Sequence, residues 1–238
     1  MLRELLRIFG SSDPLRAMGD NFGRMLDLTR EANLSAARIF FGESVGSVDA
    51  ERARLHERDA QVNALEQTIR RQVILHLSLP GNEADVPYSL LLMSLVKDVE
   101  RLGDYAKNLS EIVDIRPDPL PAGPLLDDLR GVRDGVEKMF SAVSHVFRAA
   151  EREAALVLIR DGRTLARRCD RLVTRVGRGD CDAGTTAALI LATRYYKRIG
   201  GHLLNVLSSV VMPLDKVDYY DEDIAAADSA ADSAGAGR

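Results

Sequence analysis

The sequence has no tryptophan, and aromatic residues make up only 5% of its 238 positions. Proteins that bind single-stranded nucleic acid stack bases on aromatic side chains, and this chain offers few of them. It also lacks an excess of positive charge, because its formal net charge is −4 and its pI is about 5.7. Nucleic-acid-binding domains usually carry a basic patch and a high pI. The composition therefore argues against a nucleic-acid binder.

Long apolar runs, a signal peptide and a cysteine framework are also missing. The longest apolar stretches, 89–96 and 203–214, are short or interrupted, and a membrane helix needs about 18 apolar residues or more. The first ten residues carry Arg and Glu within their apolar stretch, and no small-residue cleavage site follows. The two cysteines, Cys169 and Cys181, show no metal or redox spacing. We therefore expect a cytoplasmic protein that is peripheral to a membrane at most.

Apolar residues recur with helical periodicity along almost the whole chain, and no segment alternates convincingly with the period of two that is typical of a strand. Glycine and proline interrupt this pattern at Gly42 and Gly46, at Pro80-Gly81-Asn82 and near Gly177. The sequence therefore predicts an all-α fold without a sheet. The six expected helices cover about 14–41, 48–79, 87–115, 125–149, 154–176 and 183–212.

Four prolines in the segment 116–124 exclude a long helix there. Because three helices are expected on each side, we predict two tandem three-helix bundles, at 13–115 and 125–215, joined by this linker. Residues 1–12 form an N-terminal segment that is either an amphipathic helix resting on a membrane or partner, or a helix capping its own bundle. Small and acidic residues dominate the tail at 221–238, which predicts disorder.

Polar side chains form a stripe on each of the second and third predicted helices. On the third helix, helical spacing places Glu100, Asp104 and Asn108 one above another. Stacked carboxylates repel each other, so an ordered helix favours a bound cation or a basic partner. If the two helices pack antiparallel across Pro80, their stripes face each other and supply oxygen ligands for a hard cation. The predicted metal ligands are Asp59, Asn63, Glu66, Glu100 and Asp104.

The alternative is a solvated acidic face that basic neighbours neutralise. Surface ion pairs of that kind contribute only about 0–1 kcal/mol each. No histidine lies in either stripe, so a metal there would be held by oxygen rather than by the nitrogen and sulfur ligands typical of zinc. The basic residues available for neutralisation are Arg58, Arg70, Lys97 and Arg101.

A degraded copy of the third-helix stripe lies in the last helix, where residues 197–205 read K-R-I-G-G-H-L-L-N. In this copy Lys197 corresponds to Glu100, and Gly201 corresponds to Asp104. The preceding helix is rich in arginine, and only Asp161 and Asp170 remain as candidate ligands. We therefore predict that the second half has lost its metal site. Its basic side chains either bind an anion or an acidic partner, or form a solvated face.

Sequence motifs of common enzymes are absent. The chain has no P-loop, no G-x-G-x-x-G, no G-x-S-x-G and no H-E-x-x-H. The E-x-x-H motif of ferritin-like di-iron proteins is missing as well. We therefore predict that the protein is not an enzyme, and a metal-dependent hydrolase built on the acidic stripes is the weaker alternative.

Two motifs on neighbouring helices carry a resemblance to a known family. The stretch E-R-L-G-D-Y at Glu100–Tyr105 is followed by Asn108, and D-A-Q-V-N-A-L-E occupies Asp59–Glu66. Together with the repeat order, this resembles the PhoU family of phosphate-uptake regulators from about residue 15 to 215. The resemblance implies an all-α fold of two similar three-helix bundles.

The same resemblance implies a function, partners and a cofactor. It implies a cytoplasmic regulator of phosphate uptake and phosphate-starvation signalling that docks on a phosphate transporter subunit or a sensor histidine kinase. Some family members carry multinuclear metal clusters on E/D-x-x-x-D pairs, which here implies a cluster in the first repeat only. Its metal, whether iron, zinc or another divalent ion, is left open. The oligomeric state, including a homodimer, is also left open. Whether an intact paralogue coexists with this protein is left open as well.

Two alternatives keep the helical fold but change its role. The chain could be an accessory subunit of another phosphate or ion permease, in which case a different transporter would be retained with it. It could also be a helical structural protein without a role in phosphate metabolism.

Overall fold

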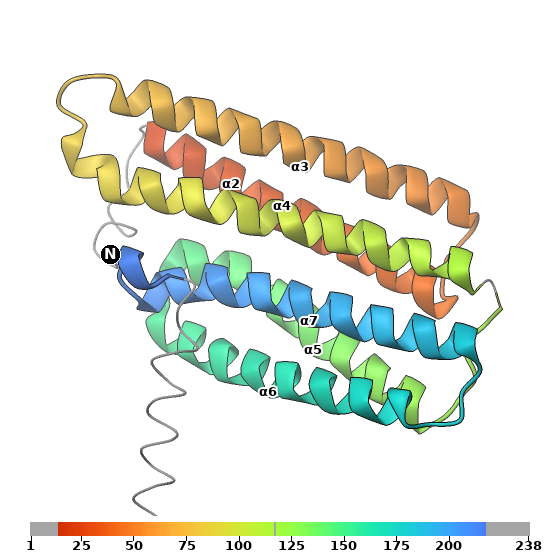
Figure 1. The fold of residues 1–238 in the computed structure, drawn as a ribbon. Coiled ribbons are helices and arrows are strands. Elements are labelled where there is room, and N and C mark those ends of the chain that lie inside the picture. The colour runs from red at the N-terminus through yellow and green to blue at the C-terminus, as the bar shows by residue number, and fades with distance from the viewer. Residues whose placement is uncertain (1–13, 117, 218–238) are drawn as a thin grey trace, which may run out of the picture.

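The computed structural model describes residues 14–116 and 118–217, and within them it contains long helices and no strand (Figure 1). This confirms the all-α prediction. The whole predicted N-terminal segment at 1–12 and the whole tail at 221–238 lie outside the described residues. The long helices are α2 (Pro14–Phe41), α3 (Val48–Leu77), α4 (Val86–Ile115), α5 (Pro124–Ala149), α6 (Arg152–Gly177) and α7 (Ala183–Val211), with short 3-10 helices η1 (Glu83–Asp85) and η2 (Leu214–Lys216).

Helix ends coincide with residues suited to ending or starting a helix. Gly42 and Gly46, between α2 and α3, and Gly81, before α4, have positive φ angles that side-chain-bearing residues rarely adopt. The side chain of Ser47 accepts a hydrogen bond from the Ala50 amide and caps α3. Asp182 caps α7 by accepting from the Thr185 amide at 2.9 Å.

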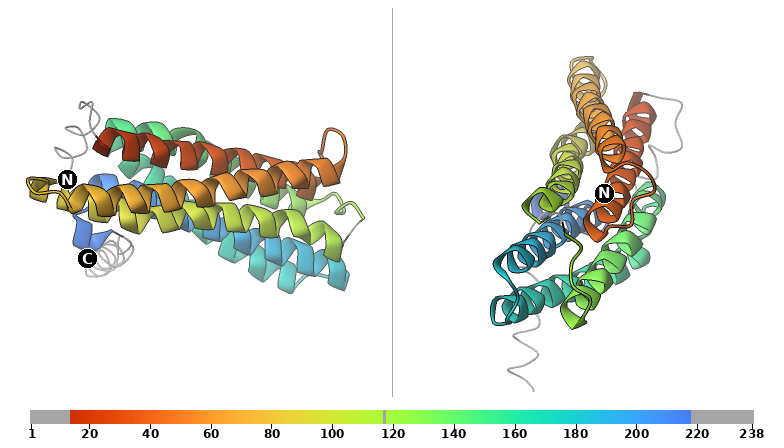
Figure 2. Two further views of the ribbon diagram at one scale, coloured as in Figure 1. Left: turned by 90° about the horizontal axis from the view of Figure 1, so that it is seen from above. Right: turned by 90° about the vertical axis from the view of Figure 1, so that its right-hand side faces the viewer.

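Each half of the chain folds into three antiparallel helices, and the halves lie side by side. In the end-on view, α3 and α6 lie at opposite edges of the molecule, and the other four helices lie between them (Figure 2). Contacts between the halves run from α4 to α7 and from α2 to α5. Buried apolar side chains of both halves form one continuous cluster. The predicted domain limits follow the helix ends, and the division into two domains stays a prediction.

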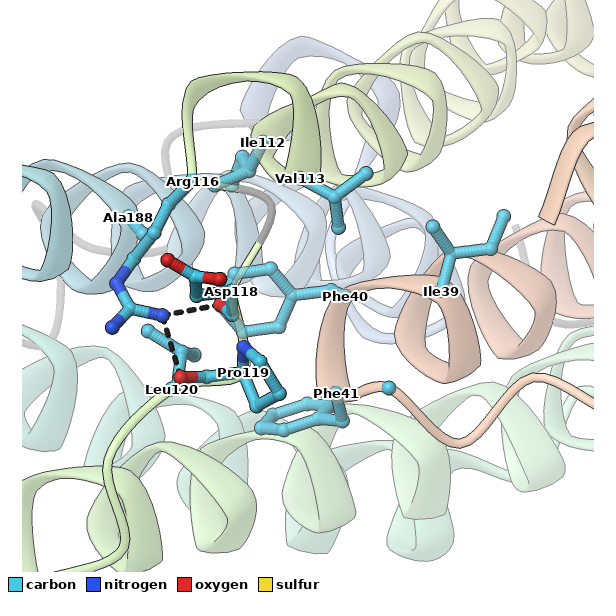
Figure 3. Close-up of a pocket in the computed structure, with 11 residues that line it drawn as sticks. Ile39, Phe40, Phe41, Ile112, Val113, Arg116, Asp118, Pro119, Leu120 and Ala188 are labelled. Atoms are coloured by element: carbon cyan, nitrogen blue, oxygen red, sulfur yellow. Dashed lines mark hydrogen bonds between the residues drawn. The ribbon is translucent and has the colours of Figure 1, made fainter.

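The proline-rich linker is held by Arg116, which follows the last residue of α4. Its Nε donates a hydrogen bond to Thr185 Oγ1 at 2.9 Å, at the start of α7. Its Nη1 donates to the backbone carbonyls of Asp118 and Pro119 (Figure 3). The linker therefore closes over the end of α2, where Phe40 lines a small pocket.

Tyr196 is a fully buried tyrosine of α7, and its hydroxyl has no hydrogen-bond partner. Burial raises the pKa of this hydroxyl, so it stays neutral. An unsatisfied buried polar group costs about 1–3 kcal/mol. We therefore expect Tyr196→Phe to raise the free energy of unfolding by up to about this amount, measured by urea denaturation. Tyr195→Phe, at a half-buried position, is the control, and a Tyr196→Phe protein less stable than wild type would contradict the expectation.

Candidate functional site

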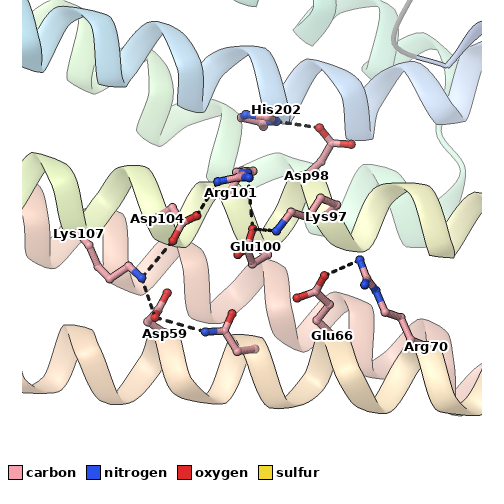
Figure 4. A network of polar contacts seen from close by, with 11 residues as sticks. Asp59, Glu66, Arg70, Lys97, Asp98, Glu100, Arg101, Asp104, Lys107 and His202 are labelled. Carbon is pink, nitrogen blue, oxygen red and sulfur yellow. Dashed lines mark hydrogen bonds and ion pairs between the residues drawn. The ribbon is translucent and has the colours of Figure 1, made fainter.

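The two predicted stripes face each other where α3 and α4 pack antiparallel (Figure 4). Asp59 on α3 and Asp104 on α4 share one cation, because Lys107 Nζ lies 2.8 Å from Asp59 Oδ2 and 3.0 Å from Asp104 Oδ1. A Cβ atom at Gly103 would lie 3.2 Å from Asp59 Oδ1. Glycine at this position therefore lets the Asp59 carboxylate lie directly against α4.

Every acidic residue of the predicted ligand set makes an ion pair. Glu66, Glu100 and Asp104 are paired within their own helices, by residues three or four positions away. Their partners are Arg70 to Glu66 at 2.8 Å, Lys97 to Glu100 at 2.8 Å, and Arg101 to Asp104 at 3.1 Å. Three of the four predicted neutralising residues thus act as expected.

The fourth predicted residue, Arg58, pairs instead with Glu31 on α2 at 3.0 Å. Lys107, which bridges the two helices, was not among the predicted neutralising residues. Burial acts to lower the pKa of Lys107, but hydrogen bonds to Asp59 and Asp104 outweigh burial and raise it. The ammonium group is therefore charged at neutral pH.

The remaining predicted ligand, Asn63, lies one turn after Asp59 on α3. Its side-chain amide donates a long hydrogen bond of 3.5 Å to Asp59 Oδ2. The other carboxylate oxygen, Asp59 Oδ1, is buried and has no hydrogen-bond partner. Asp59 therefore has one oxygen engaged and one facing Gly103.

A multinuclear metal centre needs several ligands that converge on one point. Within residues 14–116 and 118–217, no three acidic, histidine or cysteine side chains converge in this way. The carboxylates instead divide into separate ion pairs, and the cation between Asp59 and Asp104 is a lysine. The five predicted ligands lie along one helix–helix seam, but their arrangement does not fit a cluster. Metal binding to them stays an untested prediction.

The second half carries its own ion pair between α6 and α7. Lys197 Nζ lies 2.6 and 2.7 Å from the two carboxylate oxygens of Asp170. The other candidate ligand, Asp161, pairs with Lys138 of α5 at 2.8 Å. A Cβ atom at Gly201 would meet no neighbour within 4 Å. Position 201 therefore does not reproduce the close packing found at Gly103.

A polar contact joins the two halves next to the first motif. Asp98 Oδ1 on α4 accepts a hydrogen bond from His202 Nδ1 on α7 at 2.8 Å (Figure 4). It accepts a second from Asn205 Nδ2 on the same helix as His202, also at 2.8 Å. Asp98 is buried, and the His202 ring stacks on Tyr105 at a centroid distance of 5.7 Å. Two residues of the degraded second motif thus bind a residue beside the first. In the sequence, His202 and Asn205 are spaced i, i+3 on one helix, but this spacing does not indicate Asp98 as their partner.

Exposed apolar side chains gather at the turn between α3 and α4, which we call the apolar tip. Figure 1 shows this turn projecting at one end of the molecule. His76 Nε2 lies 2.9 Å from Asp85 Oδ2, and Asn82 donates to the His76 carbonyl at 2.7 Å, so the turn is braced from within. The turn was predicted from the sequence, but this surface was not. The apolar tip comprises Ile74, Leu75, Leu79, Val86 and Leu90.

Among the helices that the structure describes, none is long and apolar enough to cross a membrane.

Comparison with known proteins identifies the first half. A family profile described as the PhoU domain matches residues 15–113. No curated protein matches the sequence. A solved structure of PhoU from Pseudomonas aeruginosa is similar with a TM-score of 0.74 and 18% identity, covering 83% of this chain and 95% of that one.

A second similar structure is the phosphate transport system regulatory protein PhoU from Streptococcus pneumoniae. It has a TM-score of 0.67 and 14% identity, and the match covers 84% of this chain and 95% of that one. Both structural matches extend over both halves, whereas the profile covers the first. Residues 15–113 therefore match the PhoU domain, and the fold of both halves is similar to that of the two solved PhoU structures.

Proposed function

We propose that this protein is a regulator of phosphate uptake that acts by docking on a phosphate transporter subunit or its sensor kinase. The PhoU domain at 15–113 and the likeness to a phosphate transport system regulatory protein support the phosphate role. Paired acidic residues at the α3–α4 seam support a structural rather than a catalytic use of the motif, because each carboxylate is already engaged by a cation.

The apolar tip supports the proposal that the protein docks on a partner protein. Leu75, in the last turn of α3, is 69% exposed, and Leu79, in the connection to α4, is 62% exposed. Hydrogen bonds within this connection brace it. Clustered exposed apolar residues on a rigid element are typical of protein interaction sites. A pre-organised surface also loses little conformational entropy on binding. The tip therefore suits an apolar groove or helix pair on the partner.

Phosphate uptake in a strain lacking the protein tests this proposal. In ample phosphate, we expect the deletion to raise the initial rate of radiolabelled phosphate uptake. Expression of the wild-type chain should return this rate to the level of the parent strain. Leu75→Asp/Leu79→Asp is expected to fold but not to lower the uptake rate, because a charged tip cannot enter an apolar site. Val157→Asp, at an exposed apolar position on α6, is the matched control and is expected to lower the uptake rate as the wild-type chain does. Unchanged uptake in the deletion strain would sink the regulator proposal.

A further inference from the structure

Both halves of the molecule join their second and third helices by an aspartate and a lysine. In the first half, Asp59 of α3 meets Lys107 of α4, with 2.8 Å between Oδ2 and Nζ. In the second half, Asp170 of α6 meets Lys197 of α7, with 2.6 Å between Oδ1 and Nζ. The two pairs do not occupy equivalent sequence positions, since Lys107 follows the E-x-x-x-D motif and Lys197 lies within its degraded copy.

Lys107 occupies a point that a bridging cation would take. Its ammonium contacts oxygens from two helices within 3.0 Å, and its side chain is only 22% exposed. The two carboxylates would repel each other without it, because both lie on the same seam. The oxygen of Asp59 that contacts this ammonium, Oδ2, also accepts a long hydrogen bond from the Asn63 amide.

Lys197 has the corresponding role in the second half with fewer neighbours. It contacts both oxygens of Asp170, and Arg194 lies 3.9 Å from the same carboxylate. One carboxylate thus faces two cationic side chains, so this seam carries an excess of positive charge. Among the described residues, Lys197 contacts no carboxylate other than that of Asp170.

We propose that lysine ammonium groups, Lys107 in the first half and Lys197 in the second, join the second and third helices at the acidic motif and its degraded copy, in place of a bound metal. The first of these replaces a cation that the surrounding oxygens would otherwise accept. The second contacts the oxygens of a single carboxylate, that of Asp170, which Arg194 also faces. This proposal concerns the bundle itself and does not depend on the proposed function.

The proposal predicts opposite behaviour for two matched variants. Lys107→Met keeps the apolar stem but removes the charge, leaving Asp59, Asp104 and the Asn63 amide oxygen for a divalent cation. Lys197→Met removes the same group from the other half and leaves only Asp170, beside Arg194. We therefore expect the first variant to gain a cation site and the second to gain none.

Thermal unfolding in EDTA and in excess Mn²⁺, with elemental analysis of the untagged protein, tests this. We expect wild type to contain less than one metal per chain and to show the same Tm in both conditions. Lys107→Met is expected to unfold at a lower Tm in EDTA and to regain roughly 2–4 °C or more in Mn²⁺. Lys197→Met should show no Mn²⁺ effect. Adding Asp59→Asn to Lys107→Met should abolish the gain.

Stoichiometric metal in wild type, with a Tm that falls on chelation, would overturn the proposal. So would a folded Lys107→Met protein whose Tm does not respond to Mn²⁺, or an equal response in Lys197→Met. If Lys107→Met does not fold, the wild-type metal content and chelation still decide. Lys107→Arg then adds a second test, because it keeps the cation and should fold with a Tm that EDTA does not change.

Discussion

Replacing Phe147 with alanine is expected to lower the free energy of unfolding by about 3–5 kcal/mol. Phe147 of α5 and Phe22 of α2 are both fully buried, and their ring centroids lie 4.8 Å apart. Their contact joins the two halves through α2 and α5. Truncation removes a large apolar side chain and leaves a cavity that rigid helices on both sides cannot readily close.

Urea denaturation followed by circular dichroism measures this loss. Val157→Ala is the control, because Val157 is 45% exposed and its truncation should change stability by only about 0.5 kcal/mol or less. A single cooperative transition that moves for Phe147→Ala would show that the halves unfold together. A loss below about 1 kcal/mol would mean that the contact between α2 and α5 is not as tight as described.

Removing both donors to Asp98 is expected to cost about 3 kcal/mol, the second large effect. In His202→Ala/Asn205→Ala, the Asp98 carboxylate stays buried between α4 and α7 without the partners that hold it at 2.8 Å. A buried charge without partners is far less stable than a buried amide or apolar group. Adding Asp98→Asn to the double variant should therefore recover part of the loss.

The comparison of these variants by urea denaturation separates an ionic contact from simple packing. If His202 and Asn205 act only by filling space, Asp98→Asn would bring no recovery in the double variant. Recovery in the double variant together with a loss when Asp98→Asn is made alone would confirm the coupling.

Most helix ends could be predicted because local residues fix them. Pro14 opens α2, and Gly42 follows its last residue. Small differences arose where such signals are weak. The prediction ran α3 to residue 79, but the helix ends at Leu77. Ser78 closes it by hydrogen bonds to carbonyls of the last turn, an option that periodicity does not reveal.

The pairing of side chains across helices could be predicted only in part. Asp59 and Asp104 could be predicted to lie on facing stripes, because the sequence indicates both the helical spacing and the turn at Pro80. It did not identify Lys107 as their shared cation. Lys107 lies 48 positions from Asp59, and their contact depends on how α3 and α4 are rotated about their axes. Periodicity gives the apolar face of a helix but not this rotation to within one side chain.

Contacts between the halves were still harder to predict. Asp98 lies 104 positions from His202, and nothing local to either residue indicates the other. The apolar tip was missed for a different reason. Its residues continue the hydrophobic pattern of α3 and α4, so their exposure appears only once the helices are packed. Apolar residues of a docking surface are exposed where the hydrophobic pattern predicts that they are buried, and the sequence alone does not distinguish the two.

Site-specific photo-crosslinking at Leu75 tests docking most directly. A photoreactive residue at position 75 is introduced in cells grown in ample phosphate, and membrane fractions are then analysed for crosslinked products. If the apolar tip docks as proposed, we expect a product containing a phosphate transporter subunit or a sensor histidine kinase. The same group at Val157 should give no such product. Crosslinks only to unrelated proteins, or equal yields from both positions, would contradict docking through the apolar tip.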